Sequence, residues 1–306
     1  MTLLAGGVGG AKMARALRSV LNPGLLTVVV NVGDNTQRYG VHIAADPDTM
    51  LYTLSDTVGP NGWGRADDTF AVMDELIKLG VDTSMSLGDK DMALCALRAS
   101  RLATGEPLSS ITSDLADRFG LVDLTLLPAT DDPLETFVQT EKGEWLDFQT
   151  YFVDRHHSDG VAALAYHGSP TASPAPGVIE AIEAADLLVI APSNPPLSIW
   201  PILAVGGIEA AVRVHPQSVA VSPLFGGKPL KGPADAVMNG VGLPSGTEGV
   251  LEAYSGLIQT LFIDHGDAGD ASLGTAHNVQ VVAANTRLDH DGGPAFATTL
   301  LNEMKP

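Results

Sequence analysis

The stretch that decides the fold is Leu3-Leu4-Ala5-Gly6-Gly7-Val8-Gly9-Gly10-Ala11-Lys12. A short apolar run leads into four glycines and then into residues 13–17, whose apolar spacing predicts a helix. A strand, a glycine turn and a helix start in this order present backbone N–H groups and the positive end of a helix dipole to a ligand, which suits phosphate. The alternative is a tight strand-to-helix turn in which the glycines serve only close packing.

Two familiar nucleotide motifs do not match this turn. In the dinucleotide fingerprint a third glycine would stand where Lys12 stands, and an acid would end the second strand where Asn31 stands. A Walker A loop requires Ser or Thr after the lysine, and Met13 follows here. The predicted ligand is therefore a nucleotide-like anion, contacted by Gly6, Gly7, Gly9, Gly10, Lys12 and Asn31.

Further apolar runs predict buried strands of a parallel sheet at residues 25–31, 124–128, 187–191, 218–222, 261–264 and 279–283. Helical spacing between them predicts a Rossmann-like α/β fold, mostly parallel, with helices on both faces. We expect a single α/β domain over residues 1–306, with a mainly helical insertion at about 63–119. Residues 135–140 and 144–148 are expected to form a hairpin.

Composition excludes several classes of function. The chain of 306 residues has 36 acidic and 17 basic side chains, a formal charge of −19, which repels nucleic acid and acidic lipid. We therefore expect neither nucleic acid nor membrane as a partner. The single cysteine, Cys95, excludes an internal disulfide framework and a cysteine-rich zinc site. Without a leader or an apolar run near 18 residues, the expected location is cytoplasmic.

Acidic and amide side chains follow the second strand. Asp34 and Asn35 are followed by Asp46 and Asp48, two residues apart at a predicted helix start. Carboxylate oxygens in this spacing suit Mg²⁺, which takes one or two protein carboxylates together with phosphate oxygens. We predict Asp46 and Asp48 as metal ligands; the alternative for Asp46 is that it only caps a helix over residues 48–55.

Three more polar turns are candidates for the same crevice. Lys90, between two aspartates after Gly88, would supply positive charge, although such a pattern also fits a solvated surface. Ser193 and Asn194 follow a buried strand between prolines. Gly226 and Gly227, with Lys228 and Lys231 nearby, make a second glycine turn that holds a phosphate or is simply a mobile loop.

Eight ordered motifs resemble one family. They are residues 6–12 (GGVGGAK), 29–35 (VVNVGDN), 42–52 (HIAADPDTMLY), 87–91 (LGDKD), 127–133 (LPATDDP), 148–152 (FQTYF), 192–195 (PSNP) and 222–228 (SPLFGGK) with 232–235 (GPAD). Together they resemble the 2-phospho-L-lactate transferase family (CofD/FbiA type) of deazaflavin coenzyme F-420 biosynthesis. The likeness covers about residues 2 to 270, and the last 35 or so residues carry none of the motifs.

The resemblance implies transfer of 2-phospho-L-lactate, or phosphoenolpyruvate, from a guanosine-diphosphate-activated donor to the deazaflavin Fo. The products would be F-420-0, or its dehydro form, and GMP; Mg²⁺ would be required and a homodimer is expected. Asp48 and Lys90 match family residues associated with the deazaflavin, and Asp48 would orient or deprotonate the attacking hydroxyl. Gly6–Gly10 and Pro192–Asn194 match nucleotide-facing turns. Asn35 replaces what is often an acid, which moves the metal prediction to Asp46 and Asp48.

A related group shares the two turns but consists of nucleotide-sugar-binding regulators of the gluconeogenesis-factor type. Under that alternative the chain is a sensor rather than an enzyme. Residues 87–91 and 148–152 resemble the transferase and not the regulator.

Overall fold

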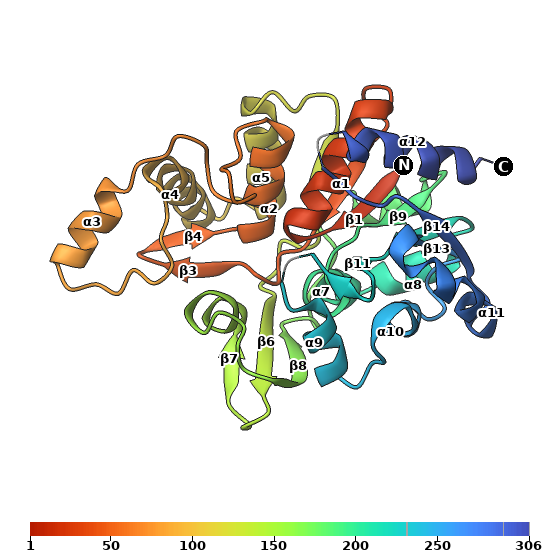
Figure 1. Cartoon of the computed structure of the whole chain (residues 1–306). Coiled ribbons are helices and arrows are strands. Elements are labelled where there is room, and N and C mark those ends of the chain that lie inside the picture. The colour runs from red at the N-terminus through yellow and green to blue at the C-terminus, as the bar shows by residue number, and fades with distance from the viewer. Residues whose placement is uncertain (231, 290, 306) are drawn as a thin grey trace.

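The computed structural model describes residues 1–230, 232–289 and 291–305, so Lys231 of the second glycine turn lies outside the described residues. At its centre is a seven-stranded sheet in the order β14-β13-β10-β9-β1-β2-β5, with every pair parallel. The strands are β1 (Thr2–Ala5), β2 (Thr27–Val30), β5 (Thr125–Pro128), β9 (Leu188–Ile190), β10 (Ser218–Val221), β13 (Thr260–Asp264) and β14 (Gln280–Ala284). The predicted doubly wound α/β fold is confirmed (Figure 1).

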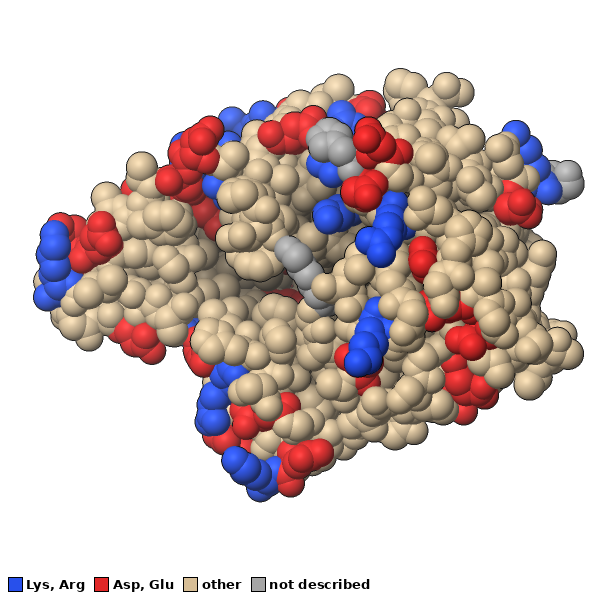
Figure 2. Space-filling model, viewed as in Figure 1, with Lys and Arg blue, Asp and Glu red and all other residues tan. Residues whose placement is uncertain are grey.

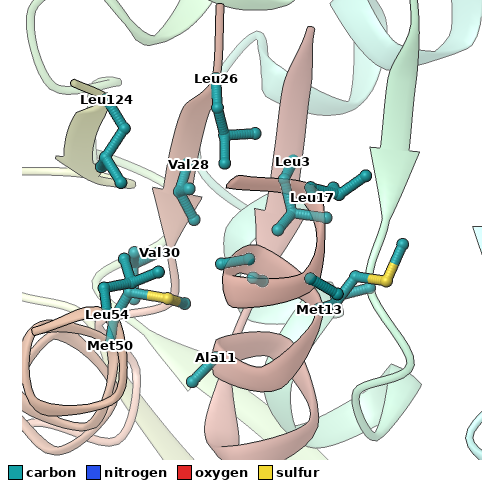
Figure 3. Close-up of a cluster of buried hydrophobic side chains, with 14 of the residues drawn as sticks. Leu3, Ala11, Met13, Leu17, Leu26, Val28, Val30, Met50, Leu54 and Leu124 are labelled. Carbon is teal, nitrogen blue, oxygen red and sulfur yellow. The ribbon is translucent and has the colours of Figure 1, made fainter. Parts of the chain in front are cut away.

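Both faces of the sheet are buried, because successive strand residues point to opposite sides. Leu3 and Val28 pack on one face under α1 (Gly7–Val20), α2 (Ala45–Leu54), α5 (Leu108–Arg118) and α12 (Gly292–Glu303). Figure 3 shows this layer, with Met13 and Leu17 of α1 against the strands. The other face packs under α6 (Val178–Glu183), α7 (Trp200–Leu203), α8 (Ile208–Val214), α9 (Ala234–Gly240) and α10 (Gly246–Ala253).

A second, antiparallel sheet lies beside the carboxyl edge of the main one (Figure 1). β6 (Glu135–Thr140) pairs with β7 (Trp145–Asp147) as the predicted hairpin, and also with β8 (Val161–His167), which the sequence analysis did not anticipate. The π-helical segment η1 (Thr150–Asp154) joins β7 to β8, and η2 (Pro195–Ile199) follows β9. Smaller hairpins are β3 (Thr36–Arg38) with β4 (Val41–Ile43), and β11 (Leu224–Phe225) with β12 (Lys228–Pro229).

The stretch between β2 and β5, which are neighbours in the sheet, contains α3 (Ala71–Lys78) and α4 (Asp89–Ala103) besides α2 and α5. Helix α3 begins at Ala71, where a carboxylate of α4 binds its first turn. Asp89 accepts hydrogen bonds from the amides of Ala71 and Val72, 3.0 Å each. Asp68 in turn accepts from the amide of Lys90, 2.8 Å. These reciprocal caps fix the two helix starts against each other.

The chain ends on the main sheet. β14 forms its edge, after η3 (His265–Leu273) and α11 (Gly274–His277), and α12 packs against α1 through Phe296 and Leu300. Within the described residues, no single helix is both long and apolar enough to cross a membrane. The apolar pair Pro195–Leu203 and Ile208–Val214 passes that test only jointly, with a bend of 97°, and it is part of the buried core.

Candidate functional site

The glycine turn after β1 is tied to the turn after β9. The hydroxyl of Ser193 donates to the carbonyl of Gly6, 2.7 Å, and lies 3.4 Å from the Gly6 amide, which donates to it. β1 and β9 are adjacent parallel strands, so their carboxyl ends meet at one edge of the sheet. The structure therefore brings the predicted Gly6 and Ser193 together at the place where open α/β sheets bind ligands.

Close packing accounts for three of the four glycines. A Cβ on Gly6 would lie 2.6 Å from Oδ2 of Asp46, one on Gly9 would lie 2.5 Å from the carbonyl oxygen of Pro192, and one on Gly10 would lie 2.9 Å from Cβ of Ala5. The packing interpretation is thus right for these positions, yet it leaves the anion-binding interpretation open. The first amides of α1 have no acceptor inside the helix, since an α-helix leaves its first four N–H groups without intrahelical partners.

Buried acidic groups lie next to this turn. Asn31, at the end of β2, donates from Nδ2 to Oδ2 of Asp46, 3.0 Å, and accepts from the amide of Gly33, 2.8 Å. Asp34 is buried, its carbonyl accepts from Nε2 of Gln149, 2.7 Å, and its Oδ1 has no partner among the described residues. Asn31, Asp34 and Asp46, all predicted from the sequence, form one acidic cluster.

Electrostatics of this cluster favour a cation. Burial raises the pKa of Asp34 well above its usual range, and the neighbouring carboxylate of Asp46 raises it further. Burial also raises the pKa of Asp46, although the hydrogen bond from Asn31 and the amide of Gly7 oppose the shift. Two buried carboxylates, one of which has an oxygen without a partner among the described residues, form a donor set that suits a hard divalent cation.

Asp48 faces a different set of groups. Both of its carboxylate oxygens accept hydrogen bonds from Arg98 of α4, one of them at 3.0 Å, in a buried ion pair. Burial raises the pKa of Asp48 to about 6 against the opposing effect of Arg98. Close by, the hydroxyl of Tyr52 donates to Asp91, 2.6 Å. Helix α2 begins at Ala45, so Asp46 lies inside its first turn and does not cap it as the alternative proposed.

Lys90 is exposed at the start of α4. Its ammonium donates to the carbonyl oxygens of Ala66 and Asp67, 3.2 and 2.6 Å, and forms no ion pair with the described residues. Ala66 and Asp67 belong to a loop that also contacts the glycine turn. A Cβ on Gly62 of the same loop would lie 2.9 Å from the side chain of Val8 in that turn. Lys90 is thus linked to the turn through this loop, and no carboxylate of the described residues neutralises its charge.

The remaining predicted residues are Lys12, Asn35 and Asn194, together with the two glycines of the second turn. Lys12 is exposed on α1, Asn35 lines a small cavity of about 60 Å³ beside β6, and Asn194 accepts from the amide of Leu197 to cap η2. Gly226 and Gly227 form the β11–β12 turn, where both amides donate to the buried carboxylate of Asp267, 3.0 and 2.6 Å. This second turn holds a carboxylate of the protein itself.

Two residues of the site were missed in the sequence. Gln149 was part of a quoted motif, but its amide contact with the backbone of Asp34 depends on the second sheet. Arg98 follows Asp91 at a spacing of seven residues on one helix, a signal that places both on the same face of α4. Because Arg98 is a charged residue in a sequence pattern typical of exposed positions, nothing in the sequence indicated that its side chain is buried.

Figure 2 shows the surface hollowed between the part that carries α1 and α2 and the part that carries β6 and β8. Acidic atoms are visible at the floor of the hollow, and Lys and Arg side chains lie to its right. The molecule therefore places positive charge beside an acidic floor in spite of its net charge.

The fold and the site define the class: an α/β protein of Rossmann-like architecture with its site at the carboxyl edge of the parallel sheet. A family model described as 2-phospho-L-lactate transferase CofD matches residues 1–300, and the chain belongs to this family of transferases. The resemblance inferred from the motifs is confirmed. Its expected limit near residue 270 was wrong, because the match includes β14 and most of α12.

Curated relatives agree with the family. A phosphoenolpyruvate transferase from Thermobifida fusca is 38% identical over 288 residues, 90% of this chain and 89% of its own length. A 2-phospho-L-lactate transferase from Methanosarcina acetivorans is 36% identical over 271 residues, 88% of this chain and 87% of its own. A solved UPF0052-family protein from Bacillus halodurans superposes with a TM-score of 0.67 over 98% of both chains at 16% identity, which shows the shared fold alone.

Proposed function

We propose that this transferase moves 2-phospho-L-lactate or phosphoenolpyruvate from a guanosine-diphosphate-activated donor to the deazaflavin Fo, giving F-420-0 or its dehydro form and GMP. The names of its relatives support the transferred group. The observation that carries the proposal is the acidic cluster of Asn31, Asp34 and Asp46 directly against the Gly6–Gly7 turn. A homodimer is a further proposal that rests on the resemblance, and a cytoplasmic location is one that rests on the sequence composition.

Mg²⁺ fits the acidic cluster. Asp34, whose buried Oδ1 has no hydrogen-bond partner in the described part of the chain, and Asp46 would hold the ion. The sequence paired Asp46 with Asp48, but Asp48 already has Arg98 as its cationic partner, which favours Asp34 in its place. A bound Mg²⁺ supplies charge neutralisation for phosphate oxygens.

The protein groups would act by position and charge. The amides of the glycine turn and the ammonium of Lys90 bind the diphosphate of the donor. The terminal ribityl hydroxyl of Fo attacks the phosphorus that bears the three-carbon acid; the new O–P bond forms in line as the bond to GMP breaks. Asp48 accepts the hydroxyl proton, which its pKa of about 6 permits at neutral pH.

Mass spectrometry tests the reaction directly. The protein is mixed with Fo, Mg²⁺ and each activated donor, and we expect one donor to give a phosphodiester of the corresponding mass together with GMP. No product with either donor, combined with tight nucleotide-sugar binding, would instead favour the regulator.

Asp48→Ala is expected to retain less than about a tenth of wild-type turnover, since a general base contributes about 100-fold or more. Asp114→Ala is the matched control, because Asp114 pairs with Arg101 and Arg118 at the surface and should leave turnover unchanged. Turnover of Asp48→Ala above a tenth removes the assignment of Asp48 and leaves the overall reaction standing.

A further inference from the structure

We propose that Arg98 is a positioning residue that fixes the Asp48 carboxylate for the acceptor hydroxyl. The inference rests on the proposed role of Asp48. Arg98 is 1% exposed and Asp48 is 4% exposed, and both terminal nitrogens of the guanidinium donate to the carboxylate, one to each oxygen. The planar fork of arginine matches a carboxylate in this two-point arrangement.

A further hydrogen bond prevents the fork from turning. Nη1 of Arg98 also donates to the carbonyl oxygen of His42 at the centre of β4, 3.0 Å. The guanidinium therefore joins three elements, because α4 carries it, α2 carries Asp48 and β4 carries His42. Each carboxylate oxygen has a second lone pair, so the pairing with Arg98 leaves acceptor capacity for a hydroxyl group.

The neighbours of Asp48 come from one face of α4. Asp91, Cys95 and Arg98 repeat at helical spacing, and the ligand atoms of Asp48, Asp91 and Cys95 lie within 4.8 Å of one another. Such a group of ligand atoms resembles a metal site, but the Arg98 guanidinium already supplies its cation. This arrangement keeps Asp48 available for the acceptor and leaves Mg²⁺ to the acidic cluster of Asn31, Asp34 and Asp46.

Stability alone explains this ion pair poorly. Taking two charges out of water costs free energy that their attraction often fails to recover, and apolar replacements of buried pairs are frequently neutral or stabilising. Arg101, one turn further along α4, shows the ordinary arrangement: it is partly exposed and pairs with Glu106 and Asp114. Arg98 has a different setting, because Asp48 is its only carboxylate partner among the described residues.

The test uses Arg98→Lys, Arg98→Met and the control Arg101→Met in the full chain, assayed with Fo, Mg²⁺ and the productive donor. Arg98→Lys keeps the charge but loses the fork, so kcat should fall about 10-fold while the donor KM stays within about twofold. Arg98→Met should lower kcat about 100-fold. Arg101→Met loses an arginine from the same helix and should keep kcat within about twofold.

A double-mutant cycle with Asp48→Asn separates positioning from general damage. If Arg98 acts through Asp48, Arg98→Met should lower kcat by less than about threefold in the Asp48→Asn background. An equal loss in both backgrounds, or a folded Arg98→Lys protein with wild-type kcat, overturns the proposal. If Arg98→Met does not fold, Arg98→Lys decides. Wild-type protein without turnover contradicts the proposed function itself.

Discussion

The two glycine turns at the carboxyl edge of the sheet look alike in sequence and differ in what their amides bind. In the turn after β1 the amide of Gly6 donates to the Ser193 hydroxyl and the amide of Gly7 contacts the Asp46 carboxylate, while the next amides of α1 have no acceptor inside the helix. The β11–β12 turn donates both of its amides to Asp267, which is buried. In the second turn, the carboxylate of Asp267 thus occupies the position in which a phosphate would bind. A glycine-rich sequence therefore predicts a turn that can bind an anion. It does not predict whether that anion is a ligand or a carboxylate of the protein itself.

Matched alanine substitutions test this difference most strongly. Gly9→Ala places a Cβ 2.5 Å from the Pro192 carbonyl, so α1 must shift and turnover should fall about 100-fold, since a misplacement of about 1 Å costs that much. Gly226→Ala meets no atom of the described residues within 4 Å, and its φ of +61° should cost about 1–2 kcal/mol of stability. Its steady-state turnover should stay within about twofold. Equal losses of kcat in the two variants would abolish the distinction.

Asp267→Ala probes the second turn alone. Removing the carboxylate leaves the amides of Gly226 and Gly227 without their acceptor, so we expect a loss of about 1–3 kcal/mol in the free energy of unfolding. Urea denaturation measures it, with turnover assayed in parallel. A large loss of turnover in a protein of nearly wild-type stability would show that the second turn serves the reaction directly.

The pH dependence of stability tests the first turn, because the buried carboxylates lie on that side of the comparison. The pKa values of Asp34, Asp46 and Asp48 are raised in the folded chain, that of Asp48 to about 6. At these three carboxylates the folded state therefore binds more protons than the unfolded state between about pH 4 and 6, which raises stability as pH falls from 7 to 5. The partly buried imidazole of His42, whose pKa burial lowers to about 4, opposes part of this gain. Without Mg²⁺ we expect Tm to increase by a few °C over that interval.

Added Mg²⁺ should raise Tm at pH 7 and reduce this pH effect, because a cation stabilises the same carboxylates. Asp46→Asn should weaken both responses, while Asp267→Ala should change neither. Scanning calorimetry at pH 5 and 7 measures these shifts. A Tm at pH 7 that Mg²⁺ leaves unchanged, or a Mg²⁺ response that Asp46→Asn does not weaken, would contradict the assignment of a cation to the first turn.

The sequence by itself determined the doubly wound sheet, because continuous apolar runs bury on both faces and each strand end is marked by polar residues. It also determined the family and all three members of the acidic cluster, since loops that follow adjacent parallel strands meet at one edge of the sheet. The contacts of Asn31 with Asp46 and of Ser193 with Gly6 illustrate this. Local sequence patterns were enough to predict a contact wherever that contact followed from the order of the strands in the sheet.

Only the tertiary structure decided which partner each polar group has. Asp46 and Asp48 are two residues apart on one helix, yet one is bonded to Asn31 and the other to Arg98, fifty residues away. Gly226 and Gly227 are bonded to Asp267, and β8 completes the second sheet. Such pairings come from the packing of distant elements, and a local pattern of charge or glycine carries no information about the group that lies opposite.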